Sequence, residues 1–179
     1  LEFRRVLFRS SLVMSNPKIF KYEIIWEKSQ ATGFLNAKKQ PLRKHESILV
    51  FYKRQATYNP QFTKGKPYVT KSNASANKGN YGKFNDNVTI NDGRRYPVSI
   101  IPFKNGGKTK HPTQKPVALF EYLIKTYTIG GETVLDNCIG SGTTAIAALN
   151  TGRFFIGIEK EKEYVDIANK RIEEAKETV

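Results

Sequence analysis

The chain has 179 residues, which suffice for one α/β domain with a core of its own and little beyond it. Lysine and arginine together number 30 against 16 acidic residues, and the net charge of +14 fits either a solvated basic surface or a polyanionic partner. The single cysteine, Cys138, excludes an internal disulfide, and no apolar run reaches membrane-spanning length, so disulfide-stapled and membrane-spanning classes are excluded for this segment.

The first ten residues, LEFRRVLFRS, fit none of the patterns that follow. Their last four letters match the translation of a sequencing adapter, so we expect residues 1–10 to be a non-native segment. Excluding them removes three arginines and one glutamate, which lowers the net charge from +14 to +12 and leaves the basic character intact. A genuine basic arm is the alternative interpretation.

Two N-terminal segments have the composition of β-strands. Residues 21–28 (KYEIIWEK) and 46–52 (ESILVFY) contain the aromatic and β-branched residues typical of strands. Residues 29–45 between them are basic and contain Gly33, Asn36 and Pro41, so we expect a loop there.

The next segment, residues 57–95, is rich in Asn, Gly, Lys, Ser and Pro and poor in apolar side chains. A connection of this length is either functional or disordered. Basic residues are concentrated between Lys38 and Lys83, with tyrosine and phenylalanine among them, and cations interleaved with stacking surface are typical of a nucleic-acid-binding face. The cations predicted to bind are Lys38, Lys39, Arg43, Lys44, Lys53, Arg54, Lys64 and Lys66.

Residues 96–103 return to strand character, and residues 116–126 have the apolar spacing of a helix. The last helix is expected over residues 161–176. Its apolar stripe, which is expected to face the core, consists of Tyr164, Ile167, Ala168 and Ile172.

Between these two helices lies the most informative stretch of the chain. A short apolar strand, residues 133–135, leads to Asp136, a Gly140-Ser141-Gly142 turn and a helix, and a second apolar strand, residues 154–158, ends at Glu159. A strand, a glycine turn, a helix and an acid-tipped strand form the nucleotide-cradling half of a Rossmann-like α/β fold. Glycine allows the backbone to approach a ligand closely, and the acid can accept hydrogen bonds from ribose hydroxyls. Cys138 is expected to fill space under this turn.

The glycine motif alone leaves the cofactor open. Residues 140–145 fit the G-x-G-x-x-A pattern of NAD sites, with Glu159 lying 17 residues beyond Gly142. Only one further strand and helix follow the motif, whereas a dinucleotide fold needs more of the sheet downstream. No P-loop pattern occurs in the sequence.

Three segments resemble motifs of the DNA amino-methyltransferases that use S-adenosylmethionine. Residues 111–116 (HPTQKP) look like motif X, residues 136–144 (DNCIGSGTT) look like motif I, and residues 156–159 (IGIE) look like motif II. Asn137 and Cys138 depart from the usual Pro and Phe of motif I, while its glycines are intact. The order, with motif X directly before motif I near the C-terminal end, is similar to the circularly permuted group.

The resemblance covers roughly residues 11–177 and implies a Rossmann-like class I methyltransferase fold. Residues 11–179 would be the C-terminal part of one such domain, with an antiparallel edge hairpin formed by the two N-terminal strands. Residues 57–95 would be a DNA-recognition insert, and residues 111–159 would carry the cofactor-binding motifs. The implied setting is the cytoplasm of a bacterium, with the gene of bacterial or phage origin, and no membrane or metal is expected.

The resemblance also assigns roles to single residues. Asp136 and the glycine turn would face the methionine part of S-adenosylmethionine, Glu159 would hold the ribose, and Thr113 and Lys115 would meet the cofactor carboxylate. A helix cap for Thr113, a solvated side chain for Lys115 and a structural role for His111 are the alternatives. The complete predicted set is His111, Thr113, Lys115, Asp136, Asn137, Gly140, Ser141, Gly142, Thr143 and Glu159.

The family's catalytic motif, Asp, Asn or Ser followed by Pro-Pro and an aromatic residue, has no counterpart in this chain. Its polar groups accept the hydrogens of the target amine and its ring stacks on the flipped base. The 179 residues contain no Pro-Pro pair, and the nearest matches are Asn16-Pro17 and Asn59-Pro60. We expect the motif to lie upstream, and the chain as given to be inactive.

The sequence therefore predicts part of an enzyme that methylates the exocyclic amine of adenine or cytosine in double-stranded DNA. A non-catalytic basic DNA-binding module with a vestigial cofactor fold is the alternative. An NAD-dependent enzyme is a third, less favoured interpretation.

Overall fold

The computed structural model describes residues 2–72, 87–105 and 114–177. The chain divides into two compact units. The main unit consists of Leu1–Asn59 and Val98–Val179, and the insert unit consists of Pro60–Pro97.

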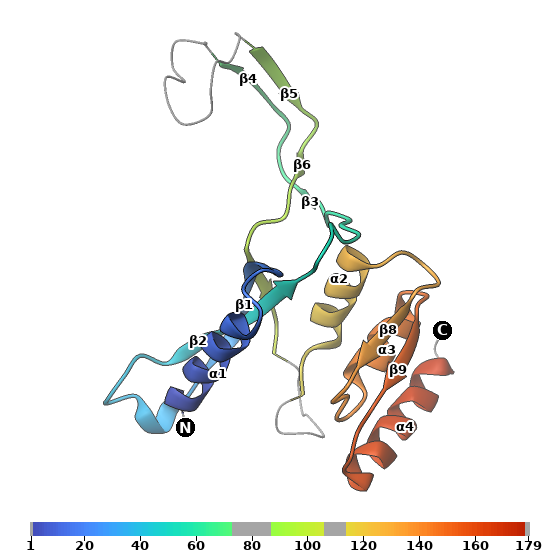
Figure 1. Cartoon of the computed structure of the whole chain (residues 1–179). Coiled ribbons are helices and arrows are strands. Elements are labelled where there is room, and N and C mark those ends of the chain that lie inside the picture. Colours follow the sequence, from blue (N-terminus) through green and yellow to red (C-terminus); the bar gives the residue numbers. More distant parts are fainter. Residues whose placement is uncertain (1, 73–86, 106–113, 178–179) are drawn as a thin grey trace. The chain divides into compact units, whose positions relative to one another are not determined.

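The main unit contains a three-stranded sheet in the order β2-β1-β7 (Figure 1). Its strands are β1 (Phe20–Thr32), β2 (Arg43–Phe51) and β7 (Ile100–Phe103). β1 pairs with β2 in antiparallel register and with β7 in parallel register. The antiparallel pairing predicted for the two N-terminal strands is therefore confirmed.

The core of this sheet lies under α2 (Val117–Tyr127). Ile24 and Trp26 of β1, Ile101 of β7 and Leu119 of α2 are buried together. The indole N–H of Trp26 donates to the carbonyl of Phe103 at 3.0 Å, so the one buried tryptophan also has its polar atom satisfied.

The second sheet of the main unit is a parallel pair of short strands, β8 (Thr133–Asp136) and β9 (Phe154–Gly157). Helix α3 (Thr143–Asn150) connects them, and α4 (Lys162–Lys176) follows β9. Val134 and Phe155 pack against Ile124, Ala147 and Ala148 on the helix-covered face. The predicted strand–turn–helix–strand order is thus present.

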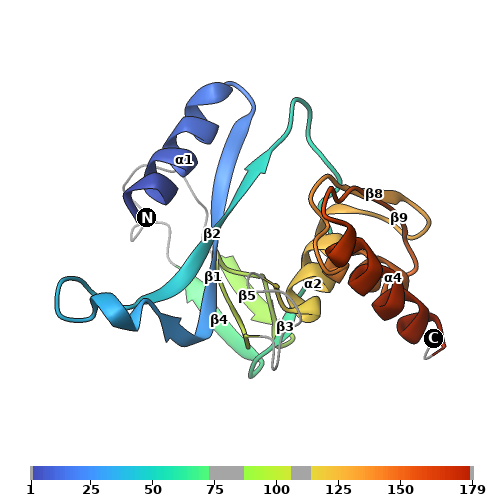
Figure 2. The same ribbon diagram turned by 90° about the horizontal axis from the view of Figure 1, so that it is seen from below.

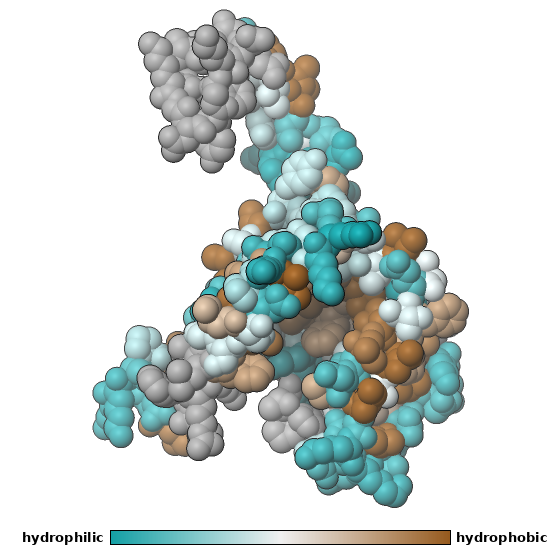
Figure 3. Space-filling view, viewed as in Figure 1, coloured by the Kyte–Doolittle hydropathy of each residue, from teal (hydrophilic) through white to brown (hydrophobic). Residues whose placement is uncertain are grey.

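The opposite face of this pair is bare in the described structure. Thr133 lies beside Phe154 and Leu135 beside Ile156, so these side chains share one face because paired residues of a sheet point the same way. Leu135, Phe154 and Ile156 are 64%, 67% and 56% exposed. Apolar residues, brown in Figure 3, gather over this part of the surface.

The insert unit consists of two small antiparallel ribbons. β3 (Thr63–Lys64) pairs with β6 (Arg94–Arg95), and β4 (Tyr68–Ser72) pairs with β5 (Asn87–Asn91). Arg95 lies over the ring of Tyr68 at 4.8 Å, and Arg94 lies over Phe62 at 5.5 Å. Residues 57–95 are therefore not the strandless connection that their composition predicts.

Several predicted boundaries are wrong by a few residues. The predicted loop over residues 29–45 is shorter, because β1 continues to Thr32 and β2 begins at Arg43. A single 3-10 turn, η1 (Phe34–Asn36), lies between them. The strand predicted over residues 96–103 begins only at Ile100. Helix α1 (Glu2–Ser15) includes most of residues 1–10, and the prediction that residues 1–10 are non-native stays a prediction.

Candidate cofactor-binding site

The glycine turn after β8 is shaped by two residues with positive φ. Gly140 has φ 53° and Gly142 has φ 83°, a region that side chains with a Cβ rarely enter. The amide of Gly142 donates to Ile139 at 3.0 Å, and its carbonyl accepts the first helical bond, from Ile146, at 3.1 Å. A Cβ at Gly142 would also lie 3.1 Å from that of Ala168, so glycine allows α4 to pack directly on the turn.

Asp136, at the end of β8, connects the strand to the beginning of α3. One of its carboxylate oxygens accepts a hydrogen bond from the amide of Cys138 at 3.0 Å. The other accepts a bond from the hydroxyl of Thr144. These bonds fix the carboxylate at the mouth of the turn. Cys138 itself is exposed, so the expectation that it fills space beneath the turn is wrong.

Glu159, just beyond β9, reaches back to the same turn. Its Oε2 accepts from the amide of Gly140 at 3.0 Å, and its Oε1 accepts from the amides of Lys160 and Glu161 at 2.9 and 3.1 Å. The two acids that end the parallel strands therefore both hold the glycine turn through backbone N–H groups.

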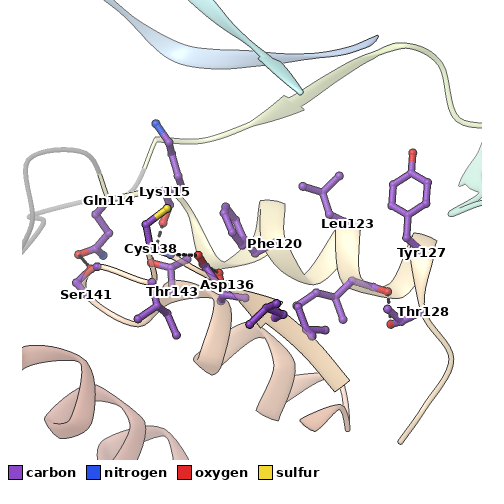
Figure 4. Close-up of a pocket in the computed structure, with 16 residues that line it drawn as sticks. Gln114, Lys115, Phe120, Leu123, Tyr127, Thr128, Asp136, Cys138, Ser141 and Thr143 are labelled. Atoms are coloured by element: carbon purple, nitrogen blue, oxygen red, sulfur yellow. Dashed lines mark hydrogen bonds between the residues drawn. The ribbon is translucent and has the colours of Figure 1, made fainter. Parts of the chain in front are cut away.

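Ser141, between the two glycines, is only 3% exposed and is held from two sides. Its hydroxyl donates to the side-chain oxygen of Gln114 at 3.1 Å, a contact that Figure 4 shows. The guanidinium of Arg171 in α4 donates to the Ser141 carbonyl and, at 3.0 Å, to its hydroxyl. Burial lowers the pKa of Arg171, and the charge of Glu174 opposes that shift.

Lys115 lies before α2 and is paired with an acid from the first sheet. Its ammonium group is 2.7 Å from Glu46, which also lies 3.6 Å from the buried Lys28. Partial burial alone raises the pKa of Glu46. The hydrogen bond and charge of Lys115 and the charge of Lys28 outweigh burial and hold that pKa below its ordinary value of 4.5. The solvated side chain considered for Lys115 is therefore not observed.

A cavity of about 540 Å³ lies between α2, the end of β8 and the glycine turn (Figure 4). This volume is in the range of small-molecule and cofactor sites. Phe120, Leu123 and Tyr127 supply its apolar wall from α2, and Asp136 and Ser141 supply polar groups from the turn. Apolar walls with a few convergent polar groups suit a ligand that has both an adenine ring and charged ends.

Half of the predicted cofactor-binding residues line the cavity. Those that line it are Lys115, Asp136, Gly140, Ser141 and Thr143. Asn137, Gly142 and Glu159 belong to the turn or hold it but do not line the cavity, and His111 and Thr113 lie outside the described residues. Sequence reasoning missed Gln114 and Arg171. Gln114 stands inside the HPTQKP segment, whereas nothing in the spacing of α4 distinguishes Arg171 from a surface arginine.

The predicted nucleic-acid-binding residues are divided between the two units. In the main unit, Lys38 and Lys39 follow η1, Arg43 and Lys44 begin β2, and Lys53 and Arg54 follow β2. Lys64 and Lys66 belong to the insert unit. All are exposed except Arg43, which is half-buried, and Lys44 lies 3.0 Å from Glu27.

Asn59, one of the two Asn-Pro positions, has a structural role. Its side-chain amide donates to the carbonyls of Lys125 and Thr128 at 3.1 and 3.0 Å, and its backbone amide donates to Thr126 at 2.7 Å. These bonds satisfy carbonyls at the C-terminal end of α2, which a helix leaves unpaired.

Within residues 2–72, 87–105 and 114–177, no helix is long and apolar enough to cross a membrane. The same residues contain no group of three or more His, Cys, Asp or Glu side chains placed to hold a metal ion.

A family model described as DNA methylase matches residues 7–170. The chain is 54% identical over 69 residues to the type II methyltransferase M2.DpnII of Streptococcus pneumoniae, an alignment that covers 38% of this chain and 26% of that protein. It is 49% identical over 90 residues to M2.LlaDCHI of Lactococcus lactis subsp. cremoris, covering 50% of this chain and 33% of that protein. The chain thus spans a third or less of these relatives' length.

Solved structures resemble the chain over most of its length. The M1.HpyAVI–SAM complex matches with a TM-score of 0.60 and 31% identity, covering 94% of this chain and 70% of that one. The cytosine-N4-specific PvuII DNA methyltransferase matches with a TM-score of 0.60 and 17% identity, covering 95% and 60%. This second likeness shows the fold alone.

Proposed function

The chain belongs to the DNA methylase family, and from this premise we propose that it forms the cofactor-binding part of a DNA amino-methyltransferase. The Rossmann-like α/β class expected from the sequence is confirmed by the solved structures that it matches. The intact protein would transfer a methyl group from S-adenosylmethionine to the exocyclic amine of adenine or cytosine in double-stranded DNA. Its setting would be the bacterial cytoplasm.

The observation that supports this proposal is the glycine turn beside the cavity. Asp136 and Glu159, at or just beyond the ends of β8 and β9, accept hydrogen bonds from its backbone N–H groups. S-adenosylmethionine would supply the methyl group on its sulfonium. Glu159, which accepts hydrogen bonds from the amide of Gly140 and from the two amides that precede α4, would hold the ribose hydroxyls beside the turn. Asp136 would face the ammonium of the methionine part, and Lys115, held by Glu46, would favour its carboxylate.

Calorimetry with S-adenosylhomocysteine on the whole chain tests this site. We expect S-adenosylhomocysteine to bind and NAD to bind far more weakly. Replacing Glu159 by Ala should weaken S-adenosylhomocysteine binding by about 1–3 kcal/mol, because ribose hydroxyls and the Gly140 amide lose their acceptor. Glu163→Ala, an exposed acid on the first turn of α4, is the matched control and should leave affinity unchanged. Tighter binding of NAD, or equal effects of the two substitutions, would contradict the proposal.

A non-catalytic DNA-binding module remains the second candidate because no Pro-Pro-aromatic segment occurs in the 179 residues. Both candidates require a DNA-binding surface. We propose that the cations between Lys38 and Lys66 supply phosphate contacts and that residues 57–95 contribute to target recognition. The cation–aromatic stacking of Arg95 on Tyr68 gives the insert unit an ordered basic surface that supports this role.

The salt dependence of DNA affinity tests the phosphate contacts. Replacing Lys38, Lys39, Arg43 and Lys44 together by Gln should flatten the log–log slope of affinity against salt. Each phosphate contact contributes about 0.9 to this slope. Arg43 is half-buried and Lys44 is paired with Glu27, so we expect a decrease of about two to three in the slope.

The matched control replaces four lysines in and just before α4, namely Lys160, Lys162, Lys170 and Lys176. All four are exposed, and they lie outside the predicted DNA face, so this variant loses the same charge without losing phosphate contacts. A slope that decreases equally in both variants, or in neither, would show that the DNA face lies elsewhere.

A further inference from the structure

The connection between β1 and β2 carries two apolar side chains that no described residue covers. Phe34 is 80% exposed and Leu35 is 98% exposed. Single exposed apolar residues are ordinary, but a neighbouring phenylalanine and leucine with this exposure at the end of a hairpin form a contiguous apolar tip. The backbone turn between β1 and β2, to which both residues belong, projects from its sheet in both ribbon views (Figures 1 and 2).

The tip is held in a defined backbone conformation. Gly33 has φ 92°, which turns the chain out of β1, and the amides of Asn36 and Ala37 donate to Gly33 and Phe34 at 2.9 Å each. The amide of Lys39 continues this pattern with a bond to Asn36 at 2.8 Å. Below the turn, Thr32 and Arg43 close the ribbon as a paired position. The apolar pair is therefore presented by a compact turn on a paired stem.

The charge around the tip identifies the kind of partner. Residues 29–45 contain four cations and no acidic residue. Lys38 and Lys39 follow η1 after Ala37, and Arg43 and Lys44 stand on the stem. An apolar tip flanked by cations, of which Lys44 is paired with Glu27, is complementary to a surface with phosphates outside and apolar ring faces inside. A DNA duplex has this arrangement once a base step opens.

We propose that Phe34 and Leu35 form a wedge that enters the base stack of DNA while the flanking cations hold the phosphates. The inference rests on the proposed DNA-methylating function and adds a specific step to it. An enzyme that acts on an exocyclic amine must take the base out of the duplex, and this costs unstacking energy. Apolar side chains inserted at a base step replace part of the lost stacking. The tip would thus stabilise the opened duplex.

The test compares the whole chain's affinity for a short paired duplex and for the same duplex with one central mismatch. A mismatch removes part of the unstacking cost, so a protein that inserts a wedge should bind the mismatched duplex about tenfold more tightly. Replacing Phe34 and Leu35 by Ser should abolish this preference and leave the salt slope unchanged. Phe34→Trp with Leu35 intact should retain the preference, because indole stacks on bases at least as well as phenyl.

The control variant replaces Phe154 and Ile156 of β9 by Thr, an apolar pair of similar size with 67% and 56% exposure. It loses comparable apolar surface away from the tip and should keep the mismatch preference. Circular dichroism on each variant confirms that the fold is intact. A preference that survives in F34S/L35S, or that disappears in F154T/I156T, overturns the wedge.

The outcomes also separate this inference from the proposed function. Salt-dependent binding by the unaltered chain without mismatch preference overturns the wedge and leaves DNA binding standing. No salt-dependent binding to either duplex overturns the DNA-binding proposal itself. If sedimentation shows that F34S/L35S dissociates an oligomer while the mismatch preference is unchanged, the tip is a protein–protein contact and the wedge is overturned.

Discussion

Arg171 is the residue that ties the last helix to the glycine turn. Its guanidinium donates to the carbonyl and hydroxyl of Ser141, while Ala168, one turn earlier, packs under Gly142. A charged donor to a carbonyl contributes more than a neutral one. Arg171 is not among the residues that line the cavity but bonds to Ser141, which is, so we assign it a positioning role that acts through the turn.

We predict that Arg171→Ala weakens S-adenosylhomocysteine binding by about 1–3 kcal/mol, because the Ser141 carbonyl loses a charged hydrogen-bond donor. Arg171→Lys should recover part of this loss, because it keeps one charged donor. Calorimetry measures both affinities. Ile172→Ala, which removes a buried neighbour on α4 but not the Ser141 contact, should lower the melting temperature with little effect on affinity. Equal losses of affinity in R171A and I172A would mean that Arg171 only stabilises the helix.

The site itself was predictable from sequence only where the contact is local or belongs to a known pattern. Asp136, Gly140 and Glu159 follow strands at recognisable spacings, and the structure brings all three to one turn. Ser141 meets Gln114 and Arg171 across 27 and 30 residues of chain, and no periodicity encodes such separations. Likewise, the pairing of Lys115 with Glu46 joins segments 69 residues apart.

At the scale of elements, apolar periodicity located the helices well and the strands less well. Helices α2 and α4 lie within one residue of their predicted ranges because each has an apolar stripe that packs, with Leu119 and Ile172 buried. β1 was predicted to end at Lys28, since Ser29-Gln30-Ala31-Thr32 lacks large apolar residues, yet its backbone pairing extends to Thr32.

The ribbons of the insert unit were also missed. β4 and β5 are held by an antiparallel hydrogen-bond ladder from Tyr68 opposite Asn91 to Ser72 opposite Asn87, and no residue of either strand is buried among those with described side chains. β5 alternates polar and β-branched residues, as Asn87-Val88-Thr89-Ile90-Asn91, but this five-residue signal lies in a segment otherwise rich in Asn, Gly, Lys, Ser and Pro.

For the whole molecule, the most consequential feature is the one-sided cover of β8 and β9. Parallel strands occur almost only with both faces covered, because their crossovers place helices on the sheet. Here Val134 and Phe155 are packed by α2 and α3, whereas Leu135 and Ile156 stand on the bare face. The type II methyltransferases that the chain matches are at least three times longer than the matched segments, as the 26% and 33% coverage shows.

We predict that the chain by itself self-associates through this face. Replacing Phe154 and Ile156 by Thr should reduce concentration-dependent light scattering, because it removes apolar surface from water-exposed positions. Threonine keeps the strand propensity, so the free energy of unfolding should change by no more than about 0.5 kcal/mol per site. Light scattering and denaturant unfolding measure the two quantities separately.

The neighbouring position on the same strand provides the control. Phe155 lies between the two and faces the helices, so Phe155→Thr should destabilise the fold by at least about 2 kcal/mol and should not reduce scattering. If light scattering decreases in F154T/I156T but not in F155T, the bare face is the site of association. Equal scattering from the F154T/I156T variant and the unaltered chain would show that association uses another surface. The exposed tip at Phe34 and Leu35 would then be the next surface to replace.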